Sequence, residues 1–254
     1  MLTLIPLTDF PFIQPDDRLD KIILQALENN RISLQEGDIL VVTQKIVSKS
    51  ENRLVNLAKV TPSAKAIQLG NEIEKDPRLV ELILQESKEV LRTRPGTIIV
   101  EHRLGFVCAN AGIDHSNVAG EGSAQEEWVL LLPADPDESA RKLREALQAA
   151  AGVSLGIMII DSHGRAWRLG TVGVAIGVAG IPGLVDLRGR KDLFGYSLRI
   201  TQVAAADELA AAASLLMGQS NEGTPVVHVR GFPYPLREAN LQELLRPKEQ
   251  DLFR

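Results

Sequence analysis

Cysteine, aromatic residues and histidine are all scarce in this chain, and each shortage excludes a class of structure or site. Cys108 is the only cysteine among 254 residues, so neither an intrachain disulfide nor a cysteine-based zinc site can form. It lies in an apolar run, which favours a place in the core over a nucleophilic role. Aromatic residues make up 4% of the chain, so leucine, isoleucine, valine and alanine must build most of the core. The four histidines show no metal-ligand spacing.

The chain also lacks a long apolar run and an excess of positive charge. Its formal net charge of -5 argues against a nucleic-acid surface and against binding to anionic membranes. The longest uncharged stretch, 169–185, is short for a membrane span and is interrupted by glycines and a proline. Residues 1–6 lack the charged start and the long apolar segment of a signal peptide. We therefore expect a cytoplasmic protein with no membrane or nucleic-acid partner.

Three common catalytic motifs are missing as well. The pattern Gly-x-x-x-x-Gly-Lys-Ser/Thr does not occur, which argues against a P-loop nucleotide site. Neither the Gly-x-Ser-x-Gly elbow nor His-Glu-x-x-His is present. Any nucleotide or metal site must therefore be built in another way.

The length suits one large domain or two intimately joined ones, and the 44% hydrophobic content is ordinary for a globular protein. Helical and strand patterns follow one another without regular alternation, which argues against a Rossmann fold. We expect an α+β fold with irregular mixed or antiparallel sheets and flanking helices. It forms one domain over 1–254, or two intertwined subdomains within that range.

The apolar periodicities predict where the elements lie. Strands are expected at 3–7, 39–43, 97–101, 104–109, 128–132, 154–160 and 224–230. Helices are expected to begin at Asp16 or Asp17, at Thr61 and near Pro77, with the last reaching Leu91, and to span 136–151 and 204–217. Segment 170–183 is expected to be a bulged strand or a packed loop, 119–127 an exposed loop, and the tail beyond Asn240 helical.

The most informative stretch for function is 157–165. Residues 157–160 predict a buried strand that stops on Asp161, where Ser162 adds a second oxygen. Gly164 permits a tight turn, and Arg165 offers a fixed positive fork. Hard cations prefer such oxygens, and phosphate prefers such an arginine.

A second stretch, 110–117, repeats this theme around Asp114, with Asn117 as a companion amide. Each aspartate alone is more simply explained as the cap of a turn. Taken together with Arg165 and Lys49, the two aspartates favour a site for metal and phosphate.

Three further segments have both a functional and a plain structural interpretation. Lys45 and Lys49 follow a buried strand and either bind phosphate or form a solvated pair at a strand end. The loop 218–223 either wraps phosphate with backbone amides or simply ends a helix. The charged group 189–192 is either an anion clamp or a turn.

Five segments occur in the order seen in one protein family. They are Gly-Asp-Ile-Leu-Val-Val-Thr-Gln-Lys-Ile-Val-Ser-Lys at 37–49, Asn-Ala-Gly-Ile-Asp-His-Ser-Asn at 110–117, Ile-Asp-Ser-His-Gly-Arg at 160–165, Gly-Arg-Lys-Asp-Leu-Phe-Gly at 189–195 and Leu-Leu-Met-Gly-Gln at 215–219. In these segments the chain resembles the coenzyme F-420-0:L-glutamate ligase family, the gamma-glutamyl ligases of deazaflavin cofactor synthesis. The likeness runs from about residue 6 to residue 230, nearly the whole chain.

The resemblance implies a GTP-dependent enzyme that joins L-glutamate to the lactyl carboxylate of coenzyme F-420-0 through an acyl phosphate, and that can extend the gamma-glutamyl tail. It implies a homodimer with an uncommon two-part α+β fold whose active groove lies at or near the subunit interface. Mg²⁺ or Mn²⁺, two per site, is implied as cofactor, with K⁺ as a further ion. No fused reductase domain is expected in a chain of this length.

The resemblance also implies roles for particular residues. Asp114 and Asp161 would hold one divalent ion, Ser162 and Gln219 a second, and Arg165 would act with the two aspartates in catalysis. The residues that would line GTP are Phe10, Pro11, Phe12, Ile13, Gln44, Lys45, Lys49, Asn117, Met217, Gly218, Gln219, Ser220, Asn221, Glu222, Gly223 and Thr224.

Two alternative functions stay open from the sequence. One is an amide ligase that uses another carboxylate acceptor, because a nucleotide site can persist while the acceptor changes. The other is a non-catalytic nucleotide binder, against which the presence of Asp114, Asp161 and Gln219 counts.

Overall fold

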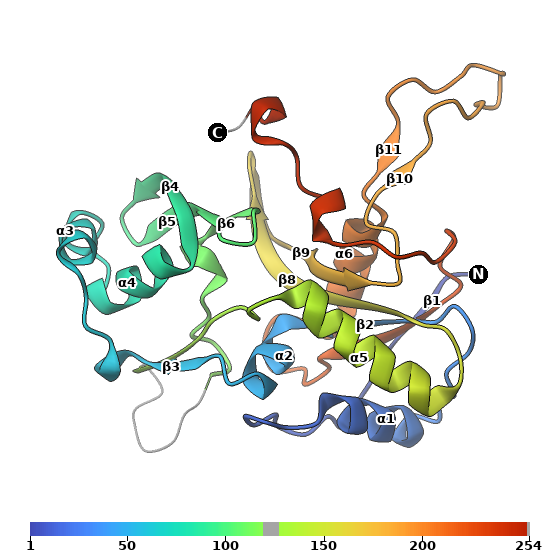
Figure 1. The fold of residues 1–254 in the computed structure, drawn as a ribbon, viewed down its shortest axis with the longest axis horizontal. Coiled ribbons are helices and arrows are strands. Elements are labelled where there is room, and N and C mark those ends of the chain that lie inside the picture. The colour runs from blue at the N-terminus through green and yellow to red at the C-terminus, as the bar shows by residue number, and fades with distance from the viewer. Residues whose placement is uncertain (119–126, 253–254) are drawn as a thin grey trace.

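The computed structural model describes residues 1–118 and 127–252 and is a mixture of helices and small sheets (Figure 1). The strands are β1 (Thr3–Pro6), β2 (Ile39–Thr43), β3 (Leu54–Asn56), β4 (Ser87–Arg94), β5 (Thr97–His102), β6 (Val107–Ala109), β7 (Trp128–Leu130), β8 (Gly156–Arg165), β9 (Arg168–Ala179), β10 (Val185–Asp186), β11 (Gln202–Val203) and β12 (Val226–Arg230). The helices are α1 (Leu19–Asn29), α2 (Gln44–Ser50), α3 (Ala64–Glu72), α4 (Pro77–Gln85), α5 (Pro136–Ala151) and α6 (Ala205–Met217). The predicted α+β class is confirmed. The exposed loop predicted at 119–127 lies, except for Glu127, outside the described residues.

The main sheet has the strand order β1-β12-β2-β8-β9, in which β2 and β8 run parallel and the other neighbours run antiparallel. Its central strands are apolar on both faces because helices cover both sides. Leu40 and Ile157 pack in one core cluster with residues of α1 and α5. Ile39, which precedes Leu40, and Met158, which follows Ile157, pack in a second cluster under α6. The period of two along each strand therefore divides the core into two layers.

The glycine-rich segment proves to be a strand with a bulge, one of its two predicted forms. Two of its glycines are needed because helices press directly on β9. A Cβ at Gly173 would lie 2.6 Å from the Ala210 carbonyl oxygen of α6, and one at Gly177 would lie 2.4 Å from Pro136 at the start of α5.

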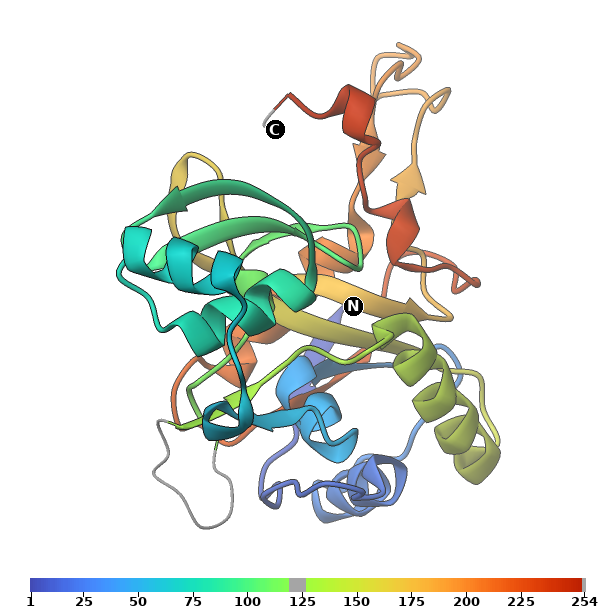
Figure 2. The same ribbon diagram turned by 60° about the vertical axis from the view of Figure 1, so that its left-hand side comes forward.

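A smaller unit of α3, α4 and the sheet β4-β5-β6 packs beside the main sheet (Figures 1 and 2). It shares the first core cluster rather than forming one of its own, since Leu82 and Ile98 belong to that cluster. Glu86 links this unit to the segment before β3 through an ion pair with Arg53 at 3.0 Å. Within the unit it also pairs with Arg103 at 2.8 Å.

Several predicted boundaries are wrong, each for a local reason. The helix after Pro77 stops at Gln85, and the following residues form β4, because pairing with β5 satisfies their backbone. The helix predicted from Thr61 begins at Ala64, where the Ser63 hydroxyl accepts the N–H of Ala66. Neither predicted aspartate caps α1; instead, the Asp17 carboxylate accepts the N–H of Gln14 in the turn before it.

In the described part of the chain, every helix is too short or too polar to cross a membrane. The tail after Asn240 contains two short 3-10 turns, Leu241–Glu243 and Lys248–Gln250, and no α-helix over the residues described. The division into one domain or two subdomains, the lack of a reductase domain and the cytoplasmic location all stay predictions.

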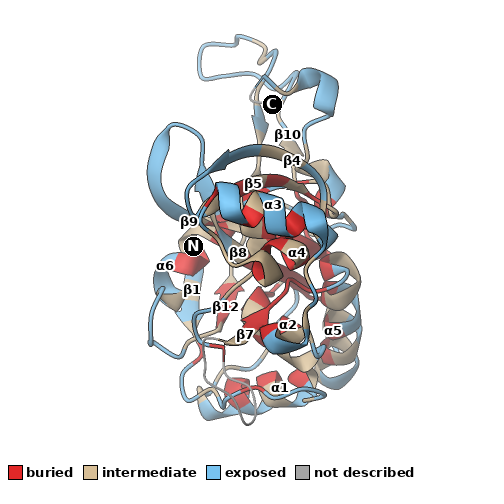
Figure 3. Cartoon of the chain, turned by 90° about the vertical axis from the view of Figure 1, so that its left-hand side faces the viewer, coloured by how far each residue is buried: buried red, intermediate tan, exposed pale blue. Residues whose placement is uncertain are grey.

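Strands β10 and β11 form the base of an arm that projects from the body of the molecule (Figures 1 and 3). Its loop, 187–201, contains the charged group 189–192 in a turn, where the Asp192 carboxylate accepts the N–H groups of Phe194 and Tyr196 at 2.8 Å each. Leu193, Phe194 and Ile200 are 98%, 95% and 88% exposed on this arm.

His102 is a buried histidine that joins the smaller sheet to its surroundings. Its ring stacks on Phe106 with centroids 5.0 Å apart, and its Nδ1 accepts the N–H of Leu104. Its Nε2 is buried without a hydrogen-bond partner. Burial lowers the pKa of His102 to about 4.

We expect this burial to make stability fall in acid. Between about pH 6.5 and pH 4 the unfolded chain binds a proton at His102 that the folded chain does not, so the free energy of unfolding falls by up to about 3 kcal/mol as the pH is lowered. Urea unfolding across this range should show a flatter dependence in His102→Gln than in the wild type. His115→Gln, at an exposed position, is the control and should keep the wild-type slope. Equal slopes in wild type and His102→Gln would contradict the assignment.

Candidate active site

A cavity of about 1080 Å³ lies at the edge of the main sheet where β2 ends. Because β2 and β8 run parallel with Thr43 opposite Ile160, the residues after them emerge side by side. Strand β12 begins at the same edge, since Val226 pairs with Val42, and brings the loop before it to this place. The topology of the sheet thus gathers three distant segments around one cavity.

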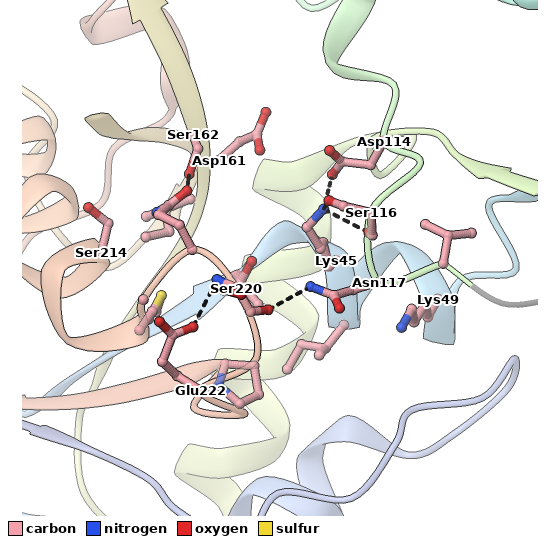
Figure 4. A pocket seen from close by; sticks show the side chains of 18 of the residues that line it. Lys45, Lys49, Asp114, Ser116, Asn117, Asp161, Ser162, Ser214, Ser220 and Glu222 are labelled. Carbon is pink, nitrogen blue, oxygen red and sulfur yellow. Dashed lines mark hydrogen bonds and ion pairs between the residues drawn. The ribbon is translucent and has the colours of Figure 1, made fainter. Parts of the chain in front are cut away.

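Asp114 is held at the cavity by both its backbone and its carboxylate. Its N–H and carbonyl group pair with Leu130 at 3.0 and 2.9 Å. Its Oδ2 accepts a hydrogen bond from Gln44 Nε2 at 2.6 Å and pairs with Lys45 Nζ at 2.7 Å (Figure 4). Burial raises the pKa of the Asp114 carboxyl, Lys45 opposes this, and the charge of Asp161 raises the pKa again, with a net shift upward. The two aspartates therefore act on each other electrostatically.

The backbone that leads to Asp114 is strained. Asn110, Ala111 and Gly112 have φ of 52°, 53° and 65° in succession, and Ala111 is buried. A non-glycine residue in this region costs on the order of 1–3 kcal/mol and persists only where the surroundings hold it. Here the Asn110 side-chain oxygen accepts the N–H of Ile98 at 3.1 Å, which fastens the turn to the smaller sheet.

Asp161 does not end its strand as predicted, because β8 continues to Arg165 through pairing with β9. Its side chain faces the cavity from the strand (Figure 4). Asp161 Oδ2 lies 3.0 Å from Nε2 of His163, two residues further along the strand, and the His163 ring packs against Phe106 at 5.2 Å. The neighbouring Ser162 donates its hydroxyl to the Gln219 side-chain oxygen at 3.0 Å.

Lys45 and Lys49 lie on helix α2, not at a strand end. Their spacing of four places them on one side of the helix. Lys45 bonds the carbonyl and hydroxyl oxygens of Ser116 at 3.2 Å each, besides Asp114. Lys49 has no acidic partner among the described residues, and burial, followed by the charge of Lys45, lowers its pKa. An anion in the cavity would stabilise this pair of cations.

The loop between α6 and β12 closes the cavity on another side. Helix α6 ends at Met217 and is followed by Gly218, whose φ of 72° and ψ of -176° suit only glycine. A Cβ at Gly218 would lie 2.1 Å from the Glu222 side chain. Ser220 donates its N–H to Glu222 at 2.8 Å and accepts a hydrogen bond from the Asn117 amide at 3.0 Å (Figure 4). The loop is thereby fastened to the segment that carries Asp114.

Most residues predicted for the site line this cavity. They are Phe10, Pro11, Phe12, Ile13, Lys45, Lys49, Asp114, Asn117, Asp161, Ser162, Met217, Gly218, Gln219, Ser220, Asn221, Glu222, Gly223 and Thr224. Gln44 and Arg165 do not. Gln44 is buried and holds Asp114 in place, and Arg165 lies at the end of β8, beyond the lining. The roles of all these residues stay predictions.

Ser116, His163 and Cys108 were not predicted for the site, yet each lines the cavity. The signal for His163 was its position two residues after Asp161, which places both side chains on one face of a strand. Burial raises the pKa of the Cys108 thiol to about 12, so it stays protonated at neutral pH and is a poor nucleophile.

The donors at the cavity suit a hard divalent cation. Asp114 and Asp161 supply carboxylates, and Ser162 and Gln219 supply neutral oxygens, which are the ligands that Mg²⁺ and Mn²⁺ prefer. Among residues 1–118 and 127–252, no group of three or more His, Cys, Asp and Glu side chains is placed to hold a metal. A cation here would therefore depend on the neutral oxygens as well.

Comparisons with known proteins agree on one family. A family model described as F420-0:Gamma-glutamyl ligase matches residues 8–231. The Coenzyme F420:L-glutamate ligase of Methanothermobacter thermautotrophicus is 46% identical over 255 residues, which cover 100% of this chain and 99% of the relative. Proteins of the same name from Methanocaldococcus jannaschii and Archaeoglobus fulgidus are 44% identical (87% of this chain, 86% of the relative) and 41% identical (98% and 95%). With a match of this extent, the chain belongs to the F420-0:gamma-glutamyl ligase family.

Proposed function

We propose that this chain is a GTP-dependent ligase that joins L-glutamate to the lactyl carboxylate of coenzyme F-420-0 and releases GDP and phosphate. Membership of the family supports glutamate ligation, because the relatives are named for it. The observation that supports the nucleotide part is the convergence of Lys45, Lys49, Asp114 and Asp161 on one cavity. The same chemistry can add further glutamates through gamma linkages.

The reaction needs an activated acceptor because a carboxylate is a poor acyl donor. The acceptor's carboxylate oxygen attacks the γ-phosphorus of GTP, which forms an acyl phosphate and releases GDP. The amine of glutamate then attacks the carbonyl carbon, the new C–N bond forms, and the C–O bond to phosphate breaks as the amine loses a proton. Both steps need negative charge to be held close to the reacting atoms.

The chain's own side chains provide for the nucleotide. Lys45 and Lys49 would bind the triphosphate as compact charges, and the loop 217–224 would border it with backbone amides. The segment 10–13 would contact the rest of the nucleotide. The cavity is at the upper end of the roughly 300–1,000 Å³ typical of small-molecule pockets, which leaves room for a second substrate.

Divalent cations, Mg²⁺ or Mn²⁺, belong to this proposal. Asp114 and Asp161 would hold one ion, Ser162 and Gln219 would hold a second, and K⁺ would be a further requirement. When bound, such ions would neutralise the oxygens between which the phosphoryl group moves. The presence of both carboxylates on one cavity supports this assignment. Burial, and to a lesser extent the charge of Asp161, raises the pKa of Asp114, and a cation would offset both effects.

A homodimer is also part of the proposal. The β10–β11 arm supports it, because a monomer would leave Leu193, Phe194 and Ile200 in water at the end of a projecting hairpin. Burying such side chains against a second copy would remove this cost, since each fully buried large apolar side chain contributes about 1.5–3 kcal/mol.

The two alternatives predict different nucleotide chemistry. An amide ligase with another acceptor would release GDP with glutamate and that acceptor but not with F-420-0. A non-catalytic binder would release no GDP under any condition. No feature of the cavity favours either over the ligase.

Turnover should depend on both substrates and on Asp161. GDP release in the presence of Mn²⁺ should require both glutamate and F-420-0, and omission of either should stop it. Asp161→Asn should lower turnover by more than about 100-fold while the protein stays folded, since it removes metal-binding charge with little change in volume. Glu145→Gln, an exposed change on α5, should have no effect. GDP release that ignores both substrates would indicate a simple nucleotidase and defeat the proposal.

Lys49 should contribute to the affinity for GTP. Lys49→Met should weaken GTP binding by about 10- to 100-fold, the equivalent of one hydrogen bond to a charged group. Lys65→Met, on the exposed side of α3, is the control. Calorimetric titration of both variants with GTP measures the difference. If GTP affinity is equal in wild type and Lys49→Met, Lys49 is not part of the nucleotide site.

The β10–β11 arm should carry the contact between the two subunits. The double variant Leu193→Asp, Phe194→Asp should sediment as a monomer where the wild type sediments as a dimer, because the arm would then carry charge into an apolar contact. Leu252→Asp, at a position 90% exposed, should sediment like the wild type. A dimer that survives the double change would show that the arm is not the contact.

A further inference from the structure

The β8–β9 hairpin forms a wall that leads out of the cavity. Beyond Asp161 the pairs Ser162–Gly173, His163–Val172 and Gly164–Thr171 continue the ladder, and Arg165–Arg168 closes it. The cavity is lined along this wall as far as the Gly164–Thr171 pair. The tip of the hairpin, 165–169, is therefore the next surface that a ligand leaving the cavity would meet.

The tip has an unusual residue at its turn. Trp167 has φ of +64°, a conformation that favours glycine or asparagine at a two-residue turn, and its side chain is 89% exposed. Leu169, beside it, is 99% exposed. This conformation has a local cost for a residue with a Cβ, and it keeps a large aromatic side chain at the surface of the tip.

The same tip carries two cations. Arg165 and Arg168 are paired across the hairpin, and residues paired in this way point to the same face. Among the described residues neither has an acidic partner; Arg165 only donates a long hydrogen bond of 3.4 Å to the Gly170 carbonyl. Along β8, Asp161, His163 and Arg165 alternate onto one face of the strand. A flat indole and two guanidinium groups suit a ligand that joins an aromatic ring to an anion.

The length of the wall fits one substrate of the proposed reaction. Arg165 lies four positions after Asp161 along the strand, about 13 Å away at a rise of about 3.3 Å per residue. A phosphorylated deazaflavin that reacts through a carboxylate at one end must place its flat tricyclic ring well away from that carboxylate. Its phosphodiester lies between the two. Along the hairpin, Asp161 comes first, Arg165 and Arg168 follow, and Trp167 lies at the tip. The substrate has its carboxylate, its phosphodiester and its ring in the corresponding order.

We propose that the tip of the β8–β9 hairpin is the binding subsite for the deazaflavin acceptor, with Trp167 stacked on the ring and Arg165 and Arg168 on the phosphodiester. This inference rests on the proposed function. It assigns Arg165 to the acceptor rather than to catalysis with the two aspartates, in agreement with its place beyond the cavity lining.

The test measures steady-state kinetics and direct binding of F-420-0. Trp167→Leu and Arg168→Gln should each raise the KM for F-420-0 at least tenfold, with the KM for GTP changed less than twofold, because stacking or one charged contact is lost. Trp167→Phe should restore most of the affinity. Arg92→Gln is the matched control, an exposed arginine on β4 that also has no acidic partner among the described residues. Quenching of tryptophan emission by F-420-0, measured without GTP, should be lost in Trp167→Leu.

The outcomes separate this subsite from the proposed function. A wild type that ligates F-420-0, with variants whose KM for it is unchanged, would overturn the subsite alone. A wild type that binds F-420-0 through Trp167 but releases no GDP would overturn the ligase and leave the subsite standing. If Trp167→Leu instead converts a dimer to a monomer and weakens GTP and F-420-0 alike, the tip is a subunit contact and the subsite is wrong.

Discussion

The parallel pairing of β2 with β8 is the constraint on which the rest of the site depends. In an otherwise antiparallel main sheet, this one parallel neighbourhood makes two chain segments, far apart in sequence, leave the same edge in the same direction. Helix α2 with its two lysines follows the first strand, and Asp161 continues the second. Since side chains alternate along a strand, a slip of one residue would exchange Asp161 and Ser162 between the two faces of the sheet and move Ile157 out of its core layer. The hydrophobic core thus sets the register on which the site relies.

The charges at the cavity are arranged in like pairs, which a ligand would relieve. Burial, followed by the charge of Lys45, lowers the pKa of Lys49. Burial raises the pKa of Asp114, Lys45 opposes this, and the charge of Asp161 raises it again, so each pair contains some repulsion. The contact between Lys45 and Asp114 compensates only in part. A polyanion beside the lysines would offset the repulsion between them, and cations beside the aspartates would offset the repulsion between the carboxylates. By linkage, whatever binds there also stabilises the fold.

The sequence specifies long, strongly periodic elements better than it specifies their ends. Helix α5 begins and ends where its apolar stripe and Pro136 place it, and β2 also matches its predicted range. The end of α4 was missed because Val90 and Leu91 suit a helical stripe as well as a strand, and only pairing with β5 decides between the two. The choice of Asp114 and Asp161 came from local motifs and resemblance, whereas their convergence depends on long-range pairing. For the same reason, the support that Gln44 gives to Asp114 could not be inferred from the sequence.

The position of the α6–β12 loop depends on two glycines that lack a side chain, Gly173 and Gly218. Gly173 lets the backbone of α6 approach β9 more closely than any side chain would allow. This contact fixes where α6 ends, and Gly218 then turns the chain in a conformation that other residues avoid. The loop that follows reaches Asn117, which belongs to the segment of Asp114. An alanine at Gly173 would therefore disturb the cavity without touching a ligand, because it would push α6, and the loop attached to it, away from β9.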